Sequence, residues 1–339
     1  MKKDNSRVTI RDVAARANVS ISTVSRVIHG NYYVNPEICE QVKQAIEDLD
    51  YVPDSNARSM KLRYRYMIGY LVSDISNRHF TVIGRALEDV IRPPGYSLNV
   101  CSNDSMEDKE MESLRALMSH RIDGLIINTS GKNDEYIGRI AQKTPMVLLH
   151  RTIDIKGFHG DLVGSDDYAG GAQLARRLIE CGHERIGIIG SDPTISTFRN
   201  RLNGLRDYLD DAGLKLSESR LVIENYTQDG GYSATKRLLD QAPEISAVAV
   251  INNAMAVGVY TFLGEVNVSI PDRISVISFG EIENAGLFRV KPTFISQQPA
   301  LIGQAAGKLL LSRIKDPSLE PRTTIIPTIY ELGDSVCSI

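Results

Sequence analysis

The first fifty residues place apolar side chains at helical spacing in short runs, separated by turn-forming residues. Thr9 and Asp12 lie three positions apart and resemble a capping box, so we predict a helix that begins near Ile10. Its inner face carries Val13, Ala14 and Ala17. The helix is short and is predicted to stop at Asn18, which tolerates a left-handed backbone.

A second short helix is predicted directly after this turn, with Ser20 as its cap. Its apolar face consists of Val24, Val27 and Ile28. The opposite face carries small, hydroxylated or basic side chains, namely Ile21, Ser22, Thr23, Ser25 and Arg26. Such a face can approach DNA phosphates closely, while Arg26 is long enough to reach a guanine edge.

Asn35 and Pro36 open a third predicted helix, and its apolar positions complete a small core. These positions are Ile38, Val42, Ile46 and Leu49. The pattern fits a three-helix head that reads DNA through a helix-turn-helix. It fits any small helical domain as well, because short look-alikes are common.

From Met67 onward, short apolar runs alternate with amphipathic segments, which predicts buried parallel strands joined by helices. In the first set the strands are 67–73, 97–101, 124–128 and 145–149, and the helices are 80–91, 109–120 and 134–141. In the second set, after Gly164, strands 185–190, 220–224, 247–252 and 275–279 alternate with helices 167–181, 199–212, 231–239 and 255–263. We therefore predict an α/β fold with two doubly wound parallel sheets, whose ligands bind at the carboxyl ends of the strands.

Several segments resemble the lactose-repressor (LacI/GalR) family of bacterial transcription regulators: TIRDVAARANVS, STVSRVI, NARSMK, RIDGLI, CGHERIG and PDRISVISF. The resemblance runs along nearly the whole chain. It implies a DNA-binding head (1–51), a hinge (52–66) and an effector-binding and dimerisation core (67–339) like a periplasmic binding protein. The implied first subdomain comprises about 67–163 and 293–319, and the second about 164–291 and 322–335.

The resemblance also implies how the chain meets DNA, as a homodimeric repressor on a pseudo-palindromic operator. Its DNA-contacting residues would be Thr9, Ser20, Ile21, Ser22, Thr23, Ser25, Arg26, His29, Asn56, Arg58 and Met60. The family pattern places Met60 as an apolar wedge in the minor groove, where it would kink the duplex. Ordinary packing is the alternative for a methionine at this position.

Effector contacts are implied where family motifs match, at Asp74, Asn77, Phe80, His150, Arg151, Arg201, Asn252 and Gln297. Arg201 matches an arginine that clamps an effector oxygen, which suits its two-pronged donor geometry. Phe80 offers a ring face to a sugar-like ligand or is core at a helix start. Arg151 lies at the cleft or is an ordinary surface charge.

Two acids found in many sugar-responsive members are missing, since this chain has Asn253 and Gly280 at those places. A carboxylate accepts hydrogen bonds from sugar hydroxyls, so its loss beside three basic side chains favours an anionic effector. A sugar acid or sugar phosphate is therefore predicted. A neutral sugar stays the alternative, with Glu281 or Asp166 supplying the missing charge.

Charge, motifs and cysteine spacing argue against other classes of function. Residues 1–66 hold 11 Lys and Arg against 8 Asp and Glu, leaving 28 against 34 for the rest, so only the head suits a polyanion. No GxGxxG, GxxxxGK[ST], GxSxG or HExxH motif is present, which argues against an enzyme. The four scattered cysteines indicate no metal site or disulfide framework, no cofactor is expected, and no signal peptide or membrane span is recognisable. A cytoplasmic regulator is favoured over a transport solute-binding protein.

Overall fold

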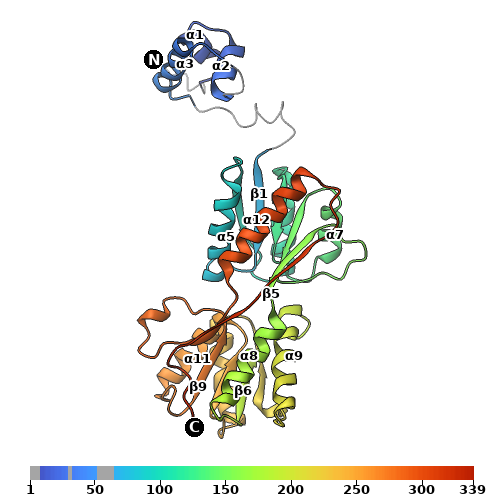
Figure 1. The fold of residues 1–339 in the computed structure, drawn as a ribbon, viewed down its shortest axis with the longest axis vertical. Helices are drawn as coiled ribbons and strands as arrows, with labels where there is room; N and C mark the ends of the chain where they lie inside the picture. Colours follow the sequence, from blue (N-terminus) through green and yellow to red (C-terminus); the bar gives the residue numbers. More distant parts are fainter. Residues whose placement is uncertain (1–7, 30–32, 52–64) are drawn as a thin grey trace. The chain divides into compact units, whose positions relative to one another are not determined.

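The computed structural model describes residues 8–29, 33–51 and 65–339, which form a helical unit up to Arg65 and an α/β unit from Tyr66 onward (Figure 1). The described part of the helical unit contains α1 (Ile10–Arg16), α2 (Ile21–His29) and α3 (Pro36–Asp48). These helices enclose a small apolar core consisting of Val13, Ala14, Ala17, Val24, Val42, Ala45 and Tyr51. The three-helix head predicted from the apolar spacing is confirmed.

Local hydrogen bonds explain where the helices of the head begin and end. The Asp12 carboxylate accepts a 2.7 Å hydrogen bond from the Thr9 backbone N–H. Asn18 adopts φ 49°, the left-handed conformation that turns the chain between α1 and α2. Ser20 Oγ then accepts from the Thr23 N–H at 3.1 Å, and Asn35 caps α3 in the same manner.

The first half of the α/β unit is a six-stranded, wholly parallel sheet. Its spatial order is β11 (Thr323–Ile326), β5 (Asp161–Ser165), β4 (Met146–Leu149), β3 (Gly124–Ile127), β1 (Met67–Val72) and β2 (Ser97–Ser102). Its helices are α5 (Arg78–Ile91), α6 (Glu107–Ser119), α7 (Asp134–Ala141) and α12 (Pro299–Lys315). We call this half the first subdomain.

The second subdomain repeats this plan with its own six-stranded sheet, in which only the last strand is antiparallel. The order is β12 (Ile329–Glu331), β10 (Thr293–Ser296), β9 (Ser275–Phe279), β8 (Ala247–Val250), β6 (Ile186–Gly190) and β7 (Leu221–Ile223). The helices are α8 (Asp167–Glu180), α9 (Ser196–Asp211), α10 (Gln228–Gln241) and α11 (Asn253–Glu265), with short 3-10 turns at Glu218–Arg220 and Ala285–Leu287. The two sheets, one wholly parallel and the other parallel except for β12, confirm the predicted α/β fold class.

The subdomain boundaries inferred from the resemblance need correction. Segment 293–319 does not lie wholly in the first subdomain, because β10 pairs with β9 in the second sheet and only α12 returns to the first. Segment 322–335 is likewise divided, since β11 pairs with β5 and β12 pairs with β10. The chain first passes from the first subdomain to the second after β5, and not at Gly164 as the implied boundary had it. Apolar runs look the same in either sheet, so only backbone pairing decides their place.

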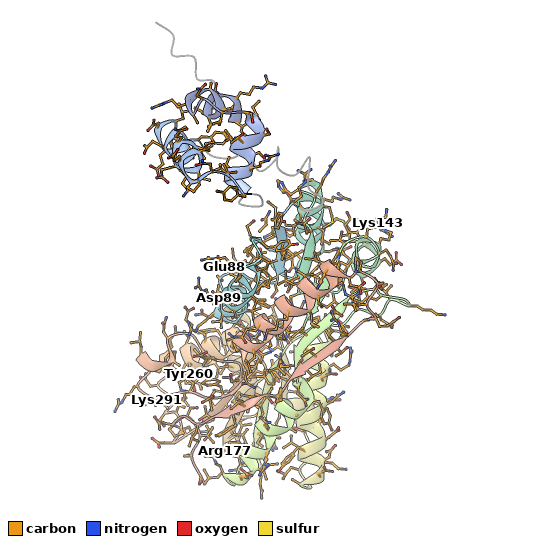
Figure 2. All side chains as sticks on the ribbon, turned by 45° about the horizontal axis from the view of Figure 1, so that its top comes forward. Glu88, Asp89, Lys143, Arg177, Tyr260 and Lys291 are labelled. Atoms are coloured by element: carbon orange, nitrogen blue, oxygen red, sulfur yellow. The ribbon has the colours of Figure 1, made fainter. Side chains whose placement is uncertain are left out.

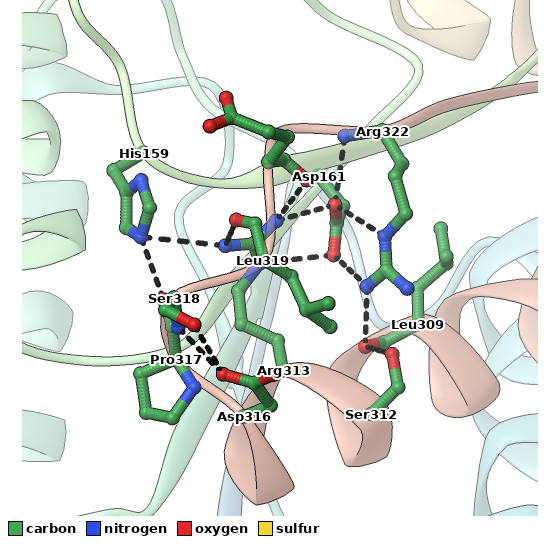
Figure 3. A network of polar contacts seen from close by, with 11 residues as sticks. His159, Asp161, Leu309, Ser312, Arg313, Asp316, Pro317, Ser318, Leu319 and Arg322 are labelled. Atoms are coloured by element: carbon green, nitrogen blue, oxygen red, sulfur yellow. Dashed lines mark hydrogen bonds and ion pairs between the residues drawn. The ribbon is translucent and has the colours of Figure 1, made fainter.

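Asp161 of β5 explains why β11 joins the first sheet. Its buried carboxylate accepts from Arg313 Nη2 and from Arg322 Nη2, each at 2.7 Å, and from the Arg322 backbone N–H at 2.9 Å (Figure 3). Arg313 also donates to the carbonyl oxygens of Leu319 and Glu320. The network therefore holds the chain between α12 and β11 against β5.

Glycines allow α8 and α9 to pack closely enough to place a functional side chain. A Cβ on Gly171 would lie 2.0 Å from the Arg201 carbonyl oxygen, and one on Gly204 would lie 2.0 Å from the Tyr168 carbonyl oxygen. This close approach brings Arg201 of α9 beside Asp167 of α8.

Charged side chains such as Asp89, Lys143 and Lys291 stay exposed on the outside of the α/β unit (Figure 2).

Candidate functional site

One face of α2 is free of core contacts and carries the side chains predicted to read DNA. Ile21, Ser22 and Arg26 are exposed, whereas Thr23 and Ser25 are half-buried. The Ser20 hydroxyl lies 2.7 Å from Ser22 Oγ and 2.8 Å from Thr23 Oγ1. Short side chains of this kind would leave room for a phosphate at the start of α2. Thr9, at the start of α1, is exposed as well.

Four of the side chains predicted to contact DNA lie outside the described part of the chain. Asn56, Arg58 and Met60 lie outside the described residues, as does the side chain of His29. The wedge role of Met60 and the hinge role of its segment therefore stay predictions.

A cavity of about 600 Å³ lies between the two sheets of the α/β unit. Its walls come from the carboxyl ends of strands, including β1, β3 and β4 in the first subdomain and β7, β8 and β10 in the second. The structure brings all eight predicted effector residues to this one cavity: Asp74, Asn77, Phe80, His150, Arg151, Arg201, Asn252 and Gln297. Open parallel sheets bind ligands at this edge because backbone N–H groups and loop side chains converge there.

Arg201 is a buried cation held in a fixed orientation. Its Nε donates to Asp167 Oδ1 at 2.8 Å, and its Nη1 donates to the Ile251 carbonyl oxygen at 2.9 Å. The guanidinium carbon lies 3.8 Å from the centre of the Phe279 ring. The Arg201 guanidinium is thereby preorganised at the cavity, and Asp167 balances part of its charge.

Arg151 is a second buried cation at the cavity, with an exposed fraction of only 9%. Its Nη1 donates to the Thr129 carbonyl oxygen at 2.7 Å. Burial lowers the pKa of Arg151, and the neighbouring Arg201 lowers it further, but a guanidinium stays charged in proteins. Arg151 is therefore not the ordinary surface charge that the sequence left open.

His150 and His79 form a half-buried pair of rings beside Phe80. Their Nε2 atoms lie 2.9 Å apart, and His150 follows β4 with φ 60°. Burial lowers the pKa of His79 to about 3, helped by the charge of Arg201. Burial and the same cationic surroundings hold the pKa of His150 well below its ordinary value. Both rings are neutral at neutral pH.

The two subdomains contact each other beside the cavity. Asn77, which caps α5, and Asn253, at the start of α11, exchange hydrogen bonds of 3.0 and 3.3 Å between their amide groups. Arg78 and Glu281 also approach to 3.9 Å. Asn253, the residue that replaces a family acid, therefore joins the two cavity walls to each other.

The charges of the cavity are unevenly distributed between its depth and its surface. Asp74 and Asp104 line it but are exposed, and Asp104 is paired with Lys109. Neither Glu281 nor Asp166 lines this cavity; Asp166 instead caps α8. Arg151 and Arg201, by contrast, are buried.

Several lining residues were not singled out from the sequence: His79, Asp104, Asn128, Asn225, Tyr226 and Thr227. Asn128 is the last residue of one predicted strand and Asn225 directly follows another, so the rule that ligands bind at carboxyl strand ends would have found them. His79 carried no such signal, because its partner His150 is distant in the sequence. The sequence pointed to Asp166 as a source of negative charge, whereas the carboxylate that pairs with Arg201 belongs to its neighbour Asp167.

Two negative findings apply to the described residues, 8–29, 33–51 and 65–339. Within these ranges no cluster of His, Cys, Asp and Glu side chains could hold a metal ion. No helix there is long and apolar enough to cross a membrane.

The helical unit and the α/β unit are both similar to proteins of the same family. Residues 9–54 match the bacterial regulatory proteins of the lacI family, and residues 65–333 match the periplasmic binding proteins and sugar binding domain of the LacI family. The chain is 33% identical to the ribose operon repressor of Escherichia coli K12 over 330 residues, covering 96% of this chain and 99% of that protein.

Solved structures show the same likeness. A transcriptional regulator CelR in complex with cellobiose is 26% identical, with a TM-score of 0.74, and the match covers 97% of this chain and 100% of that one. A LacI-family regulator from Enterococcus faecium with bound ribose is 29% identical, with a TM-score of 0.72 and coverage of 80% and 99%.

Proposed function

The chain belongs to the LacI family of bacterial regulatory proteins, and from this we propose that it is a transcriptional repressor controlled by a small carbohydrate-type effector. It binds a pseudo-palindromic operator in double-stranded DNA as a homodimer, in the cytoplasm. Members of this family are regulators and not enzymes.

One observation supports this function above the others: a helix-turn-helix head precedes a core with a polar cavity between its two sheets. A binding protein for transport has no use for the head, and a simple DNA-binding protein has no use for the cavity. An effector that contacts both walls of the cavity binds one arrangement of the subdomains better than another, and this difference is what regulation requires.

For the effector we propose an anionic carbohydrate, held at the buried end of the cavity by Arg201 and Arg151. The two guanidinium groups line the cavity, whereas the buried carboxylates near them, Asp167 and Glu110, do not, and burial strengthens the attraction of the cations for a negative charge. Both histidines beside them are neutral, so they add no charge of their own.

A neutral sugar is the second candidate, and two observations favour it. Asp167 already balances part of the Arg201 charge. The related regulators described above were solved with cellobiose and with ribose, which are both uncharged.

A ligand screen followed by calorimetry tests the proposal. Sugar acids, sugar phosphates and neutral sugars are first compared by the increase in melting temperature of the full chain, since a ligand of the folded state stabilises it. A matched acid and parent sugar are then titrated. The acid is expected to bind at least about tenfold more tightly, because a charge-assisted hydrogen bond contributes roughly 1.5 to 3 kcal/mol.

Arg151→Gln is the variant of choice, because Arg201→Ala would leave the buried Asp167 carboxylate unpaired and destabilise the fold. It is expected to reduce affinity for the acid at least about tenfold and affinity for the parent sugar by less than about threefold. Operator affinity without effector should be retained. Tighter binding of the neutral sugar by the unaltered chain would reject the anionic effector and leave the second candidate.

A further inference from the structure

The pairing of His79 with His150 bears on which chemical group of the effector the cavity recognises, an inference that rests on the proposed function. His79 belongs to the first turn of α5, and His150 follows β4. Their ring centres lie 4.9 Å apart at an interplanar angle of 43°, and both rings line the cavity.

Two neutral imidazoles in this contact hold one proton between their Nε2 atoms. If His79 Nε2 carries it and donates, His150 must carry its own proton on Nδ1. If His150 Nε2 donates instead, its Nδ1 is a bare acceptor, and His79 is protonated on Nδ1. His79 therefore determines whether His150 Nδ1 is a donor or an acceptor.

His150 Nδ1 itself is buried and finds no hydrogen-bond partner among the described residues. The same is true of Asn128 Oδ1, whose Nδ2 donates to the Leu149 carbonyl oxygen at 2.9 Å. Both side chains line the cavity. Buried polar atoms without partners are costly, so a ligand that supplies partners to both is favoured.

The charge at this end of the cavity suits one negative charge better than two. Arg151 and Arg201 are two buried cations that line the cavity, and the buried carboxylates of Asp167 and Glu110 offset part of their charge, Asp167 through its 2.8 Å contact with Arg201. A phosphate monoester carries roughly −1.5 to −2 at neutral pH, whereas a carboxylate carries a single charge.

We propose that His150 Nδ1–H donates to a carboxylate oxygen of a hydroxy acid effector, that Asn128 Oδ1 accepts from one of its hydroxyl groups, and that His79 is a positioning residue which holds His150 in the Nδ1–H tautomer. Carboxylate oxygens only accept hydrogen bonds, so they select this tautomer. The limited positive charge at this end of the cavity then favours the single charge of a sugar acid over that of a sugar phosphate.

Nitrogen NMR of the full chain, labelled on its histidines, tests the tautomer directly. The chain has six histidines, and the signals of the pair are assigned with His79→Gln and with the exposed His120→Gln as a reference. The probes are gluconate, glucuronate and galacturonate, with glucose, galactose and glucose 6-phosphate for comparison. In the complex with a bound acid, His150 should be protonated on Nδ1 and His79 on Nε2. Protonation of His150 on Nε2 in that complex would overturn the proposal.

Substitution of His79 separates positioning from packing. His79→Phe keeps a ring but removes the donor, and should reduce affinity for the acid about tenfold, the loss of one buried hydrogen bond of about 1.4 kcal/mol. His79→Gln can still donate to His150 Nε2 and should stay within about threefold of the unaltered chain. Equal losses in both variants would show that His79 only fills space.

The results distinguish failure of the anionic effector from failure of the role proposed for the histidine pair. If neither the acids nor glucose 6-phosphate binds the unaltered chain more tightly than the parent sugars, the proposed anionic effector is rejected. If glucose 6-phosphate binds more tightly than the acids, an anion is recognised but the carboxylate proposal is wrong. If an acid binds and His150 Nδ1 stays unprotonated, only the role of the histidine pair is rejected.

Discussion

Arg26 is the exposed basic residue on the outer face of α2, among the short side chains of Ser22 and Ser25. A guanidinium can donate two hydrogen bonds to a guanine edge, and such a contact depends on the base sequence. We expect Arg26→Ala to cost about 1 to 3 kcal/mol on an operator selected from random DNA, and much less on unselected DNA. Fluorescence anisotropy with both DNAs at the same salt concentration measures the difference.

Arg16 of α1 offers a matched control, since it has the same side chain on a different helix, where it pairs with Asp48 of α3. Arg16→Ala should weaken binding to both DNAs slightly and to a similar extent, because an exposed ion pair and a distant charge carry no sequence information. If Arg26→Ala reduced both affinities equally, its contact would be to the DNA backbone.

At the scale of elements, the starts of α5 and α11 are joined by the amide pair of Asn77 and Asn253. We expect the pair to stabilise the arrangement of the cavity walls seen here, by about 1 kcal/mol in effector binding. A double-mutant cycle with Asn77→Ala and Asn253→Ala, measured by calorimetry, gives this coupling energy. Purely additive losses would mean that each amide contacts the effector separately.

The Asp161 network joins β5, α12 and the chain leading into β11 (Figure 3). Burial works to raise the pKa of Asp161, but the hydrogen bonds from Arg313 and Arg322 together outweigh it and hold the pKa below its ordinary value. A carboxylate with a lowered pKa stabilises the fold fully at neutral pH, and this contribution is lost as the pH falls below about 4.

Asp161→Asn is therefore expected to reduce the free energy of unfolding by about 3 to 5 kcal/mol at neutral pH, because Arg313 is left buried without a counter-charge. The deficit should be smaller near pH 3 than at neutral pH, because below about pH 4 the carboxyl group is protonated in the unfolded chain and its lowered pKa in the fold contributes less stability. Urea unfolding at both pH values measures it. The exposed Asp316, which caps a turn at Ser318, is the control, and Asp316→Asn should cost about 1 kcal/mol or less. A deficit that does not change with pH would assign the effect to packing.

At the scale of the whole molecule, the head and the α/β unit each have a separate hydrophobic core. Val24→Ala removes buried apolar surface from the head and should cost about 2 kcal/mol, a large part of the stability of so small a domain. Operator affinity is expected to fall while the effector titration stays unchanged.

Val276→Ala in β9 is the counterpart in the second subdomain, where Val276 is fully buried. It should lower the unfolding temperature of the α/β unit and leave that of the head in place. Calorimetric scans of both variants resolve the two transitions. A single transition that shifts in both variants would contradict independent cores.

Local patterns determined the head and the order of the strands and helices. The capping residues Thr9, Ser20 and Asn35 act through hydrogen bonds to residues a few positions away, so their meaning is present in the sequence. Apolar spacing likewise marks helices and buried strands without reference to distant residues. The cavity residues were named from the family resemblance, and several of them follow parallel strands whose carboxyl ends meet at one edge of a sheet.

Tertiary structure alone decided which sheet a strand joins and which charges face each other. β10 and β11 are both short apolar runs, and their assignment depends on pairing with β9 and β5 and on the arginines around Asp161. The same holds for Asp167 beside Arg201 and for His79 beside His150, 71 positions apart. Such contacts depend on how helices pack over a sheet, which no local pattern encodes, and they set the charge and hydrogen-bonding character of the cavity.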